Sequence, residues 1–369
     1  MNLSKIKKIL RKVLPVSIYD FLVFVAVSYA KVKAKARTFL LLHPVTILGR
    51  YPGYLYPRHL FIFLTTRCNL HCFICRREGF KGEDLNFENL YKLKNAVRHA
   101  AVIDLTGWGE CFLYPRFDDV LRYIYSLNKR KRLIYITSNG SILSKSKAEL
   151  LRGRLSGMTI SLNAATSETY NRDMRHGRFE KTLENIRDFL STLDGGDRER
   201  ISLHFVAHTE NFREIPDFVK LARELGIPKV TVGQYLVAIK EHIQYSLLNV
   251  KDEYNAIIDQ AKKQGEKLGV EVGARRFYHE DPAKATVCTD PFNFCFVLTD
   301  GAVGPCCFCG SYRIGNVYEQ DFEAVWFGKE YQKLRRSRHL PVCRSCSPYI
   351  PFDDPRTHLT ASYKEGGES

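Results

Sequence analysis

The sequence predicts an α/β protein built around a partial (β/α)6, TIM-like barrel, with a basic helical arm before the barrel and a small cysteine-rich module after it. Two observations predict this fold. Between residues 60 and 236, apolar runs of strand length alternate with longer amphipathic segments, a pattern typical of a parallel sheet covered by helices. The cysteines lie mainly in two places, near residue 70 and after residue 287.

Six apolar runs define the expected strands. Amphipathic stretches such as Phe87–His99 and Phe179–Leu193 separate them and are expected to be helices. Six units make most of a barrel but leave it open, and the chemistry of such folds lies at the carboxyl ends of the strands. The six runs are Leu60–Leu64, Val102–Thr106, Leu133–Thr137, Met158–Leu162, Leu203–Val206 and Val230–Val232.

The segments outside the barrel differ in composition. The module has turn signals at Asp300–Gly301, Gly310 and Gly315, which indicate a small β-hairpin, and a helix is expected over Phe322–Arg336. A helix over Asp252–Leu268 is the only clear element of the connecting region. The expected division is an arm at 1–50, the core at 55–240, a connecting region at 241–287, the module at 288–350 and a tail at 351–369.

The arm carries much of the chain's net charge of +16. Nine Lys and Arg residues and a single acid precede residue 38. Lys5–Leu14 has helical apolar spacing, and the uncharged run Phe21–Ala30 is too short to span a bilayer, which takes about 20 residues. Two interpretations remain open: a helix lying on an anionic membrane surface, or a helix packed on the protein's own core. No nucleic-acid partner is expected, because the arm lacks a recognisable nucleic-acid module.

The cysteine usage indicates metal binding. No secretory signal with a small-residue cleavage site is visible, so a cytoplasmic protein, either soluble or peripheral on the inner face of the membrane, is expected. Directly after the first strand, the segment Thr65-Thr66-Arg67-Cys68-Asn69-Leu70-His71-Cys72-Phe73-Ile74-Cys75 places three thiols at C-x3-C-x2-C spacing. Thiolates are the ligands that iron–sulfur centres prefer, and three ligands leave one iron of a cubane open. The alternatives are buried thiols or a zinc site completed by His71 or Cys111.

Three further strand ends carry short motifs. They are Thr106-Gly107-Trp108-Gly109-Glu110, Thr137-Ser138-Asn139-Gly140 and Ile160-Ser161-Leu162-Asn163. Together with the cysteine segment, they resemble the radical S-adenosylmethionine (SAM) superfamily in order and position over residues 60–346. The resemblance implies a [4Fe–4S] cluster held by Cys68, Cys72 and Cys75. In that family the open iron binds SAM, and one electron cleaves SAM to a 5′-deoxyadenosyl radical that abstracts hydrogen from a substrate.

The same resemblance implies the residues that contact SAM. Gly109 and Glu110 match the motif that contacts the amino group, and Ser161 would contact the ribose and carboxylate region, with Arg175 as a further carboxylate partner. Ser138 and Asn139 match a strand-end motif, and Ile74 would cover the adenine. The chain departs from the family in having Ile74 for an aromatic residue, Cys111 for a proline and Asn163 for an acid.

Cys111 is the expected catalytic residue, because a thiol beside SAM is able to donate or accept a hydrogen atom. The alternative is a small apolar residue that packs the strand end.

The later cysteines resemble the SPASM/Twitch extension of radical SAM enzymes, a small C-terminal iron–sulfur module. Cys288, Cys306, Cys343 and Cys346 form a set of four thiolates, enough for one auxiliary [4Fe–4S] cluster. No cysteine follows Cys346, which favours one cluster of the shorter Twitch type. Cys295 competes with Cys288 as first ligand, Cys307 and Cys309 are expected to be partly buried thiols, and a zinc knuckle is the alternative for the module.

The expected function is radical SAM modification of an unidentified substrate. An auxiliary cluster suits oxidation, because it is able to take or relay an electron. A flavodoxin or ferredoxin is the expected electron donor. Family resemblance leaves a peptide, a membrane-proximal sugar or a lipid-linked molecule open as substrate. The competing class is a non-catalytic iron–sulfur or zinc protein that only binds a partner.

Overall fold

The computed structural model describes residues 56–75, 81–235, 237, 240–276, 290–306 and 312–337. The expectations for the arm at 1–50, for the tail, for Gly310 and for the cysteines at 288, 307, 309, 343 and 346 fall outside these residues. Within the described part of the chain, no helix is both long and apolar enough to cross a bilayer.

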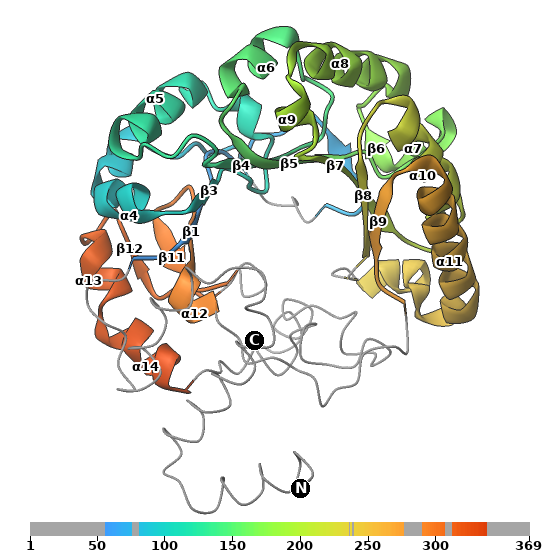
Figure 1. Cartoon of the computed structure of the whole chain (residues 1–369). Coiled ribbons are helices and arrows are strands. Elements are labelled where there is room, and N and C mark those ends of the chain that lie inside the picture. Colours follow the sequence, from blue (N-terminus) through green and yellow to red (C-terminus); the bar gives the residue numbers. More distant parts are fainter. Residues whose placement is uncertain are drawn as a thin grey trace, which may run out of the picture.

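One ten-stranded sheet runs through the molecule in the order β12-β11-β10-β1-β3-β4-β5-β7-β8-β9. All neighbours from β10 to β9 are parallel, and only the hairpin partners β11 and β12 are antiparallel. The sheet curves into an open arc with the helices outside it (Figure 1). The strands are β1 (His59–Ile62), β3 (Val102–Asp104), β4 (Ile134–Ser138), β5 (Leu155–Ser161), β7 (Ile201–Ala207), β8 (Lys229–Gln234), β9 (Glu271–Ala274), β10 (Phe294–Val297), β11 (Ala302–Gly304) and β12 (Gly315–Asn316).

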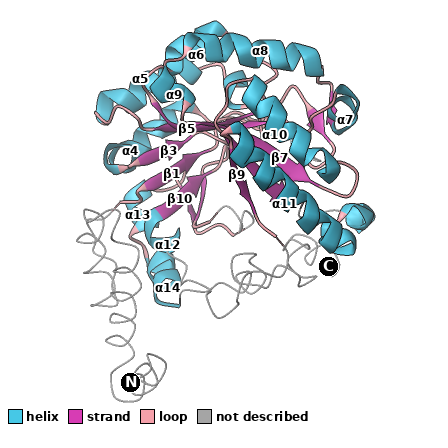
Figure 2. Ribbon diagram, turned by 45° about the vertical axis from the view of Figure 1, so that its right-hand side comes forward, coloured by secondary structure: helices cyan, strands magenta, loops and turns pink. Residues whose placement is uncertain are grey.

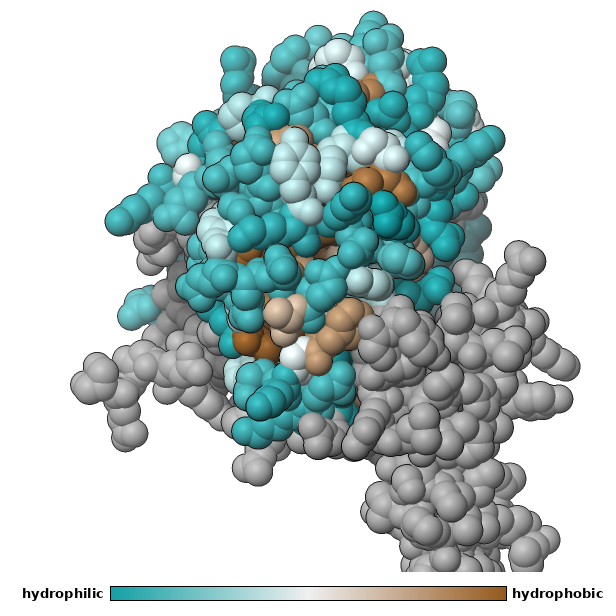
Figure 3. Space-filling view, turned by 90° about the vertical axis from the view of Figure 1, so that its left-hand side faces the viewer, coloured by the Kyte–Doolittle hydropathy of each residue, from teal (hydrophilic) through white to brown (hydrophobic). Residues whose placement is uncertain are grey.

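The helices follow the strands and cover the convex side of the sheet (Figure 2). In the main α-helices apolar residues recur at helical spacing: Phe117, Val120, Leu121 and Ile124 of α5 are all buried. Their solvent face is mostly hydrophilic, with small scattered apolar patches (Figure 3). The helices are η1 (Phe87–Leu93), α4 (Lys94–His99), η2 (Cys111–Leu113), α5 (Phe117–Leu127), α6 (Lys145–Leu151), α7 (Ser167–Asp173), α8 (Phe179–Thr192), α9 (Gly195–Arg198), η3 (Phe212–Glu214), α10 (Ile215–Glu224), η4 (Lys240–Tyr245), η5 (Leu247–Val250), α11 (Lys251–Leu268), α12 (Asp290–Asn293), α13 (Phe322–Trp326) and α14 (Lys329–Ser337).

The strands show which side of the sheet holds the core. In β4, Ile134 and Ile136 are fully buried, whereas the alternating Tyr135 and Thr137 stay half-buried. Side chains of a strand alternate between its two faces, so the buried members point to the helices and the others to the concave side. The partial-barrel fold class and all six expected strands are confirmed.

The structure extends the sheet beyond the six expected units. Glu271–Ala274 lies in the segment expected to be a connecting region, yet it forms β9, parallel to β8. Phe294–Val297 lies in the cysteine-rich module, yet it forms β10, parallel to β1. Both strands are short, and β10 pairs with β1 at the other end of the described chain, which local periodicity does not reveal.

The module's hairpin forms as expected, with two local differences. The turn at Asp300–Gly301 connects β10 to β11, and Gly301 adopts the left-handed conformation there (φ 80°). Gly315 lies in β12 and not in a turn. The expected helix over Phe322–Arg336 is broken into α13 and α14 near Gly328, where a Cβ atom would come within 2.2 Å of the Ala324 carbonyl oxygen.

Candidate functional site

The cysteine loop, residues 65–75, follows β1 at the carboxyl edge of the sheet. Its start is held by Thr66, whose amide donates to the Glu83 carbonyl (2.8 Å), and by an ion pair between Arg67 and Asp84. Its end pairs with the chain after α7: β2 (His71–Cys72) forms an antiparallel ladder with β6 (Met174–Arg175). The ladder sets His71 opposite Arg175 and Cys72 opposite Met174. Arg175 is exposed beside the loop.

Gly109 brings the end of β3 against the cysteine loop. A Cβ atom at this position would lie 2.4 Å from the Arg67 carbonyl oxygen and 2.5 Å from that of Thr65. Real Cβ atoms essentially never come so close, so only glycine fits without a backbone shift. The next amide, that of Glu110, donates to the Arg67 carbonyl (2.7 Å).

Glu110 joins two strand ends from a buried position. Its Oε1 accepts a hydrogen bond from the Ser138 hydroxyl (2.9 Å), and its Oε2 accepts one from the Asn139 amide (2.8 Å). Burial raises the pKa of Glu110 to about 7, although these hydrogen bonds act in the opposite direction. The carboxyl is therefore poised near neutral pH and fixed between β3 and β4.

Asn139 carries this network to the first cysteine. Its Nδ2 donates to Cys68 Sγ (3.6 Å) and to Asn69 Oδ1 (3.1 Å), and the Leu70 amide also donates to Cys68 Sγ (3.5 Å). Such N–H donors are the outer contacts that tune thiolate ligands of clusters. Ser141 accepts from Asn69 Nδ2 (2.7 Å) and donates to Asn139 Oδ1 (2.6 Å). Asn69 and Ser141 were not expected from the sequence, although both lie in or directly beside the motif segments.

The thiols of the cysteine loop fit an iron–sulfur cluster in chemistry and exposure. Cys68, Cys72 and Cys75 are half-buried thiols, whereas Cys111 and Cys295 are buried in the core. Over the described ranges, no three His, Cys, Asp or Glu side chains already meet as a metal site. The fit therefore rests on the three partly exposed thiols, the donors to Cys68 and the close approach at Gly109.

Ser161 lies at the end of β5, and its register partner on β7 is His204. His204 Nδ1 is 2.8 Å from the Thr231 hydroxyl, and Gly233 leaves room for the imidazole ring. Burial lowers the pKa of His204, so its neutral form is favoured. No sequence signal singles out His204, because a lone histidine inside a strand is usually a packing residue.

The two residues between Cys72 and Cys75 have different surroundings. Ile74 is half-buried in the loop. Phe73 packs into the protein: its ring stacks on His242 (centroids 4.6 Å) and meets Tyr245 edge-on (4.6 Å). Tyr235, directly after β8, holds His242 through a hydrogen bond between its hydroxyl and Nδ1 (2.8 Å). Phe73 thus anchors the cysteine loop to the chain that follows β8.

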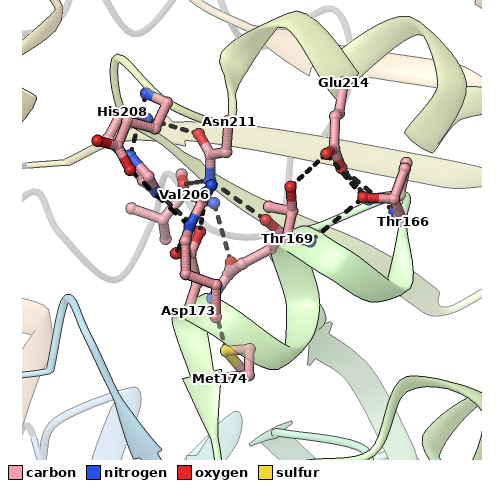
Figure 4. Close-up of polar contacts among 12 residues, drawn as sticks. Thr166, Thr169, Asp173, Met174, Val206, His208, Asn211 and Glu214 are labelled. Carbon is pink, nitrogen blue, oxygen red and sulfur yellow. Dashed lines mark hydrogen bonds and ion pairs between the residues drawn. The ribbon is translucent and has the colours of Figure 1, made fainter.

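A buried polar network supports the other side of the loop (Figure 4). Asp173 Oδ2 lies 3.0 Å from Nε2 of the buried His208, and Arg172 donates to Oδ1 (2.8 Å). Burial alone would raise the pKa of Asp173, but the contacts with His208 and Arg172 outweigh it and the pKa is lowered. The Asp173 carbonyl accepts from the Phe73 amide (2.8 Å), so this network fixes the backbone of the cysteine loop.

Asn163 occupies the position at which the family that the sequence resembles has an acid, and its side chain makes contacts that hold strands together. It adopts a left-handed conformation (φ 60°), accepts from the Val206 amide (2.9 Å) and lies against Met174 Sδ (3.4 Å). Its side chain thus ties β5 to β7 and β6.

Cys111 lies in the hydrophobic core at the start of η2, 2% exposed. Its Sγ is 4.0 Å from Glu110 Oε1. Burial, followed by the charges of Glu110 and Asp104, raises the pKa of the thiol well above its usual range, so the thiol stays protonated. The site brings Cys111 next to Glu110 but encloses it in apolar side chains.

Two cysteines of the module are described. Cys295 is fully buried in β10, beside Tyr331 and Arg335 of α14, and burial raises its pKa to about 12. Cys306 is half-buried beside Asp290. Burial, and then the Cys306 thiol, raises the pKa of Asp290 to about 6.

Comparison with known proteins identifies the family. The radical SAM superfamily matches residues 62–222, and SPASM, an iron–sulfur cluster-binding domain, matches residues 288–347. A Pyrococcus furiosus protein that modifies the cofactor of the tungsten-containing aldehyde ferredoxin oxidoreductase is 22% identical over 79% of this chain and 87% of its own length. A probable GTP 3′,8-cyclase of Saccharolobus islandicus is 28% identical over 49% of this chain and 60% of its own length.

Solved structures share the fold. SuiB of Streptococcus suis bound to S-adenosylmethionine superposes with a TM-score of 0.59 at 19% identity, covering 80% of this chain and 71% of SuiB. Native anSMEcpe with bound AdoMet and the Cp18Cys peptide gives a TM-score of 0.60 at 18% identity, covering 83% and 93% of the two chains. This chain belongs to the radical SAM superfamily: it is a radical SAM enzyme with a [4Fe–4S] cluster, SAM and a C-terminal SPASM iron–sulfur domain.

Proposed function

We propose that this enzyme oxidises its substrate after radical abstraction of hydrogen, with Cys68, Cys72 and Cys75 as ligands of the catalytic cluster. When bound, the reduced cluster and SAM supply the 5′-deoxyadenosyl radical that abstracts the hydrogen atom. The observation that supports this loop as the cluster site is the hydrogen-bonded path from Glu110 through Asn139 to Cys68, because it joins three strand ends around one loop.

Each residue of this path has a separate task. Gly109 keeps the end of β3 close to the cysteine loop, and the backbone there is proposed to contact the SAM amino group. Glu110 orients Ser138 and Asn139, and Asn139 directs an N–H group at Cys68. Ser161, on the concave face of β5, and Arg175, beside the loop, are proposed to contact the ribose and the carboxylate of SAM. Ile74 is the proposed apolar cover for the adenine.

The module is proposed to hold one auxiliary cluster through Cys288, Cys306, Cys343 and Cys346. A closed cluster with four thiolates accepts an electron from a substrate radical, which suits oxidation. Cys295 is a poorer candidate than Cys288, because it is buried between β10 and α14. An external reductant such as a flavodoxin or ferredoxin is proposed to supply the electron for SAM cleavage.

A peptide is the proposed substrate class. Two structures with the same fold were solved with peptides: anSMEcpe with the Cp18Cys peptide, and SuiB with its precursor peptide SuiA. The enzyme is proposed to act in the cytoplasm, and its basic N-terminal arm is proposed to contact an anionic membrane surface.

The decisive experiment replaces Cys68, Cys72 and Cys75 together with alanine. Anaerobically reconstituted wild-type protein is expected to carry about eight irons, and the triple variant about four, because one of two cubanes is lost. The variant is expected to form no 5′-deoxyadenosine with dithionite and SAM. Cys295→Ala is the matched control and should keep both iron and SAM cleavage. Zinc in place of iron, or cleavage by the triple variant, contradicts the proposal.

A further inference from the structure

The parallel sheet gathers basic side chains at the edge opposite the cysteine loop. We define the strand-start rim as the described residues from the last turn of each helix to the first residue of the parallel strand that follows, together with Arg58 before β1. Its acids are Glu149, Asp194, Asp197, Glu199, Glu224, Glu266, Glu271 and Asp290. Its cations are Arg58, Arg98, Lys129, Arg130, Lys131, Arg132, Arg152, Arg154, Arg198, Arg200, Arg223, Lys229 and Lys267.

Backbone hydrogen bonds show that these segments are neighbours in space. The Arg58 carbonyl accepts from the Ala101 amide (2.7 Å), and the Arg154 carbonyl accepts from the Leu133 amide (3.0 Å). The Tyr125 hydroxyl lies between two loops, 3.0 Å from the Lys131 carbonyl and 3.2 Å from that of Arg154. The rim is thus one continuous surface, although its cations are spread over more than a hundred residues of sequence.

Local pairing accounts for only part of this charge. Asp197 is fully buried against Arg132, and Glu271 pairs with Lys229 (2.8 Å), so these acids do not offset the other cations. The longest run of basic residues lies between α5 and β4, where residues 129–132 are all basic. The segment between this helix and this strand contains no acidic residue. Arg130 and Lys131 are exposed, and within the described residues neither forms an ion pair.

We propose that the strand-start rim is a docking surface for an anionic lipid bilayer. Basic residues near an anionic leaflet attract it additively, and a continuous rim is able to engage several of them at once. The described chain also begins at this edge: Tyr56 stacks on His99 at the end of α4 (centroids 4.8 Å). The basic arm at 1–50 precedes Tyr56 in the sequence, which favours a joint contact of arm and rim with one membrane.

The rim is badly placed for the electron donor. The cysteine loop lies at the carboxyl edge of the sheet, and β5 alone spans seven residues between the two edges. A strand rises about 3.3 Å per residue, so the edges are roughly 20 Å apart. An acidic donor that docked on the rim would be far from the catalytic cluster. Docking through the rim also directs the cysteine loop away from the bilayer, toward a water-soluble substrate.

The test compares full-length variants with the same change in charge. Lys129, Arg130 and Lys131 are replaced together with glutamate in the rim variant. In the control variant Lys94, Arg187 and Lys263, which are exposed on helices, are replaced in the same way. Flotation uses phosphatidylcholine vesicles with or without phosphatidylglycerol, at low and at high salt. Wild-type and control proteins should float with anionic vesicles at low salt, and the rim variant should bind at least about tenfold more weakly.

A third variant, with Lys5, Lys7, Lys8, Arg11 and Lys12 changed to glutamine, separates the arm from the rim. The proposal requires that loss of rim charge weakens binding whether the arm is basic or neutral. Equal weakening in the rim and control variants would show a general charge effect and overturn it. Unchanged flotation of the rim variant, together with a loss of binding of that variant to a short RNA or DNA duplex, would also overturn it. SAM cleavage and iron content, measured in parallel, should be unchanged, because the proposal does not depend on the reaction.

Discussion

Glu110 illustrates how burial changes the chemistry of a single residue. Glu110 is 2% exposed, and both of its carboxyl oxygens accept hydrogen bonds from residues of another strand end. Burial raises its pKa from 4.5 to about 7, which means that folding favours the protonated carboxyl. The motif around Glu110 is visible in the sequence, whereas its protonation depends on the surrounding side chains.

This shift predicts a pH dependence of stability. The folded-state pKa of Glu110 lies above the unfolded one, so Glu110 does not oppose folding below about pH 4.5. As pH rises from there through about 7, its ionisation lowers the free energy of unfolding. By linkage, this loss of stability amounts to about 3 kcal/mol. The melting temperature of wild-type holoenzyme should therefore fall between pH 5 and 8 more steeply than that of Glu110→Gln. The exposed Glu149→Gln is the control and should follow wild type. Equal slopes for all three proteins would contradict the assignment.

Cys111 can be tested separately from Glu110. Its thiol is protonated and enclosed in the core, so we expect Cys111→Ala to retain SAM cleavage and product formation, with a slightly lower melting temperature from the lost packing. A role as hydrogen-atom donor predicts otherwise: the variant would make 5′-deoxyadenosine but no authentic product. Measuring both compounds in the same reaction decides between packing and catalysis.

At the scale of elements, the contact between the β3 end and the cysteine loop is the least tolerant part of the site. A side chain at position 109 would meet two backbone carbonyl oxygens, which cannot move without displacing the loop. The sequence marks Gly109 as part of a strand-end motif, but only the structure shows this steric requirement.

Gly109→Ala should therefore weaken SAM binding at least about tenfold and destabilise the protein by about 2 kcal/mol through overpacking. Gly195→Ala is the matched control, because a Cβ atom added there would have no other atom within 4 Å. Equilibrium binding of SAM to reconstituted protein and thermal melting measure the two effects. Wild-type affinity in Gly109→Ala would show that the close approach is dispensable.

At the scale of the whole molecule, the barrel and the described part of the SPASM domain share one sheet. β10 of the module pairs with β1 of the barrel, and Phe63 of the barrel belongs to the same apolar cluster as Phe294 and Phe296. A shared sheet and shared core predict that the two parts unfold together.

The chain's two tryptophans report on each part separately, since Trp108 follows β3 and Trp326 lies in α13. In Trp108→Phe the denaturation is followed through the fluorescence of Trp326, and in Trp326→Phe it is followed through that of Trp108. Calorimetry gives the stability of each variant, so that the loss of stability from the substitution itself can be subtracted. After this correction the two denaturation midpoints should coincide. A module signal that is lost at clearly lower denaturant would contradict a single cooperative unit.

Features that depend on local pattern could be predicted from the sequence alone: the six strands, the cysteine spacing and the motifs at the strand ends. These follow from side-chain periodicity and covalent distance, which neighbouring residues fix. Four features could be seen only in the folded chain: Phe294–Val297 pairs with β1, Asn139 reaches Cys68, Phe73 turns inward against His242, and distant basic residues meet at one rim. Each of these depends on which strands lie side by side, and strand pairing is set by packing over the whole sheet, which no short stretch of sequence encodes.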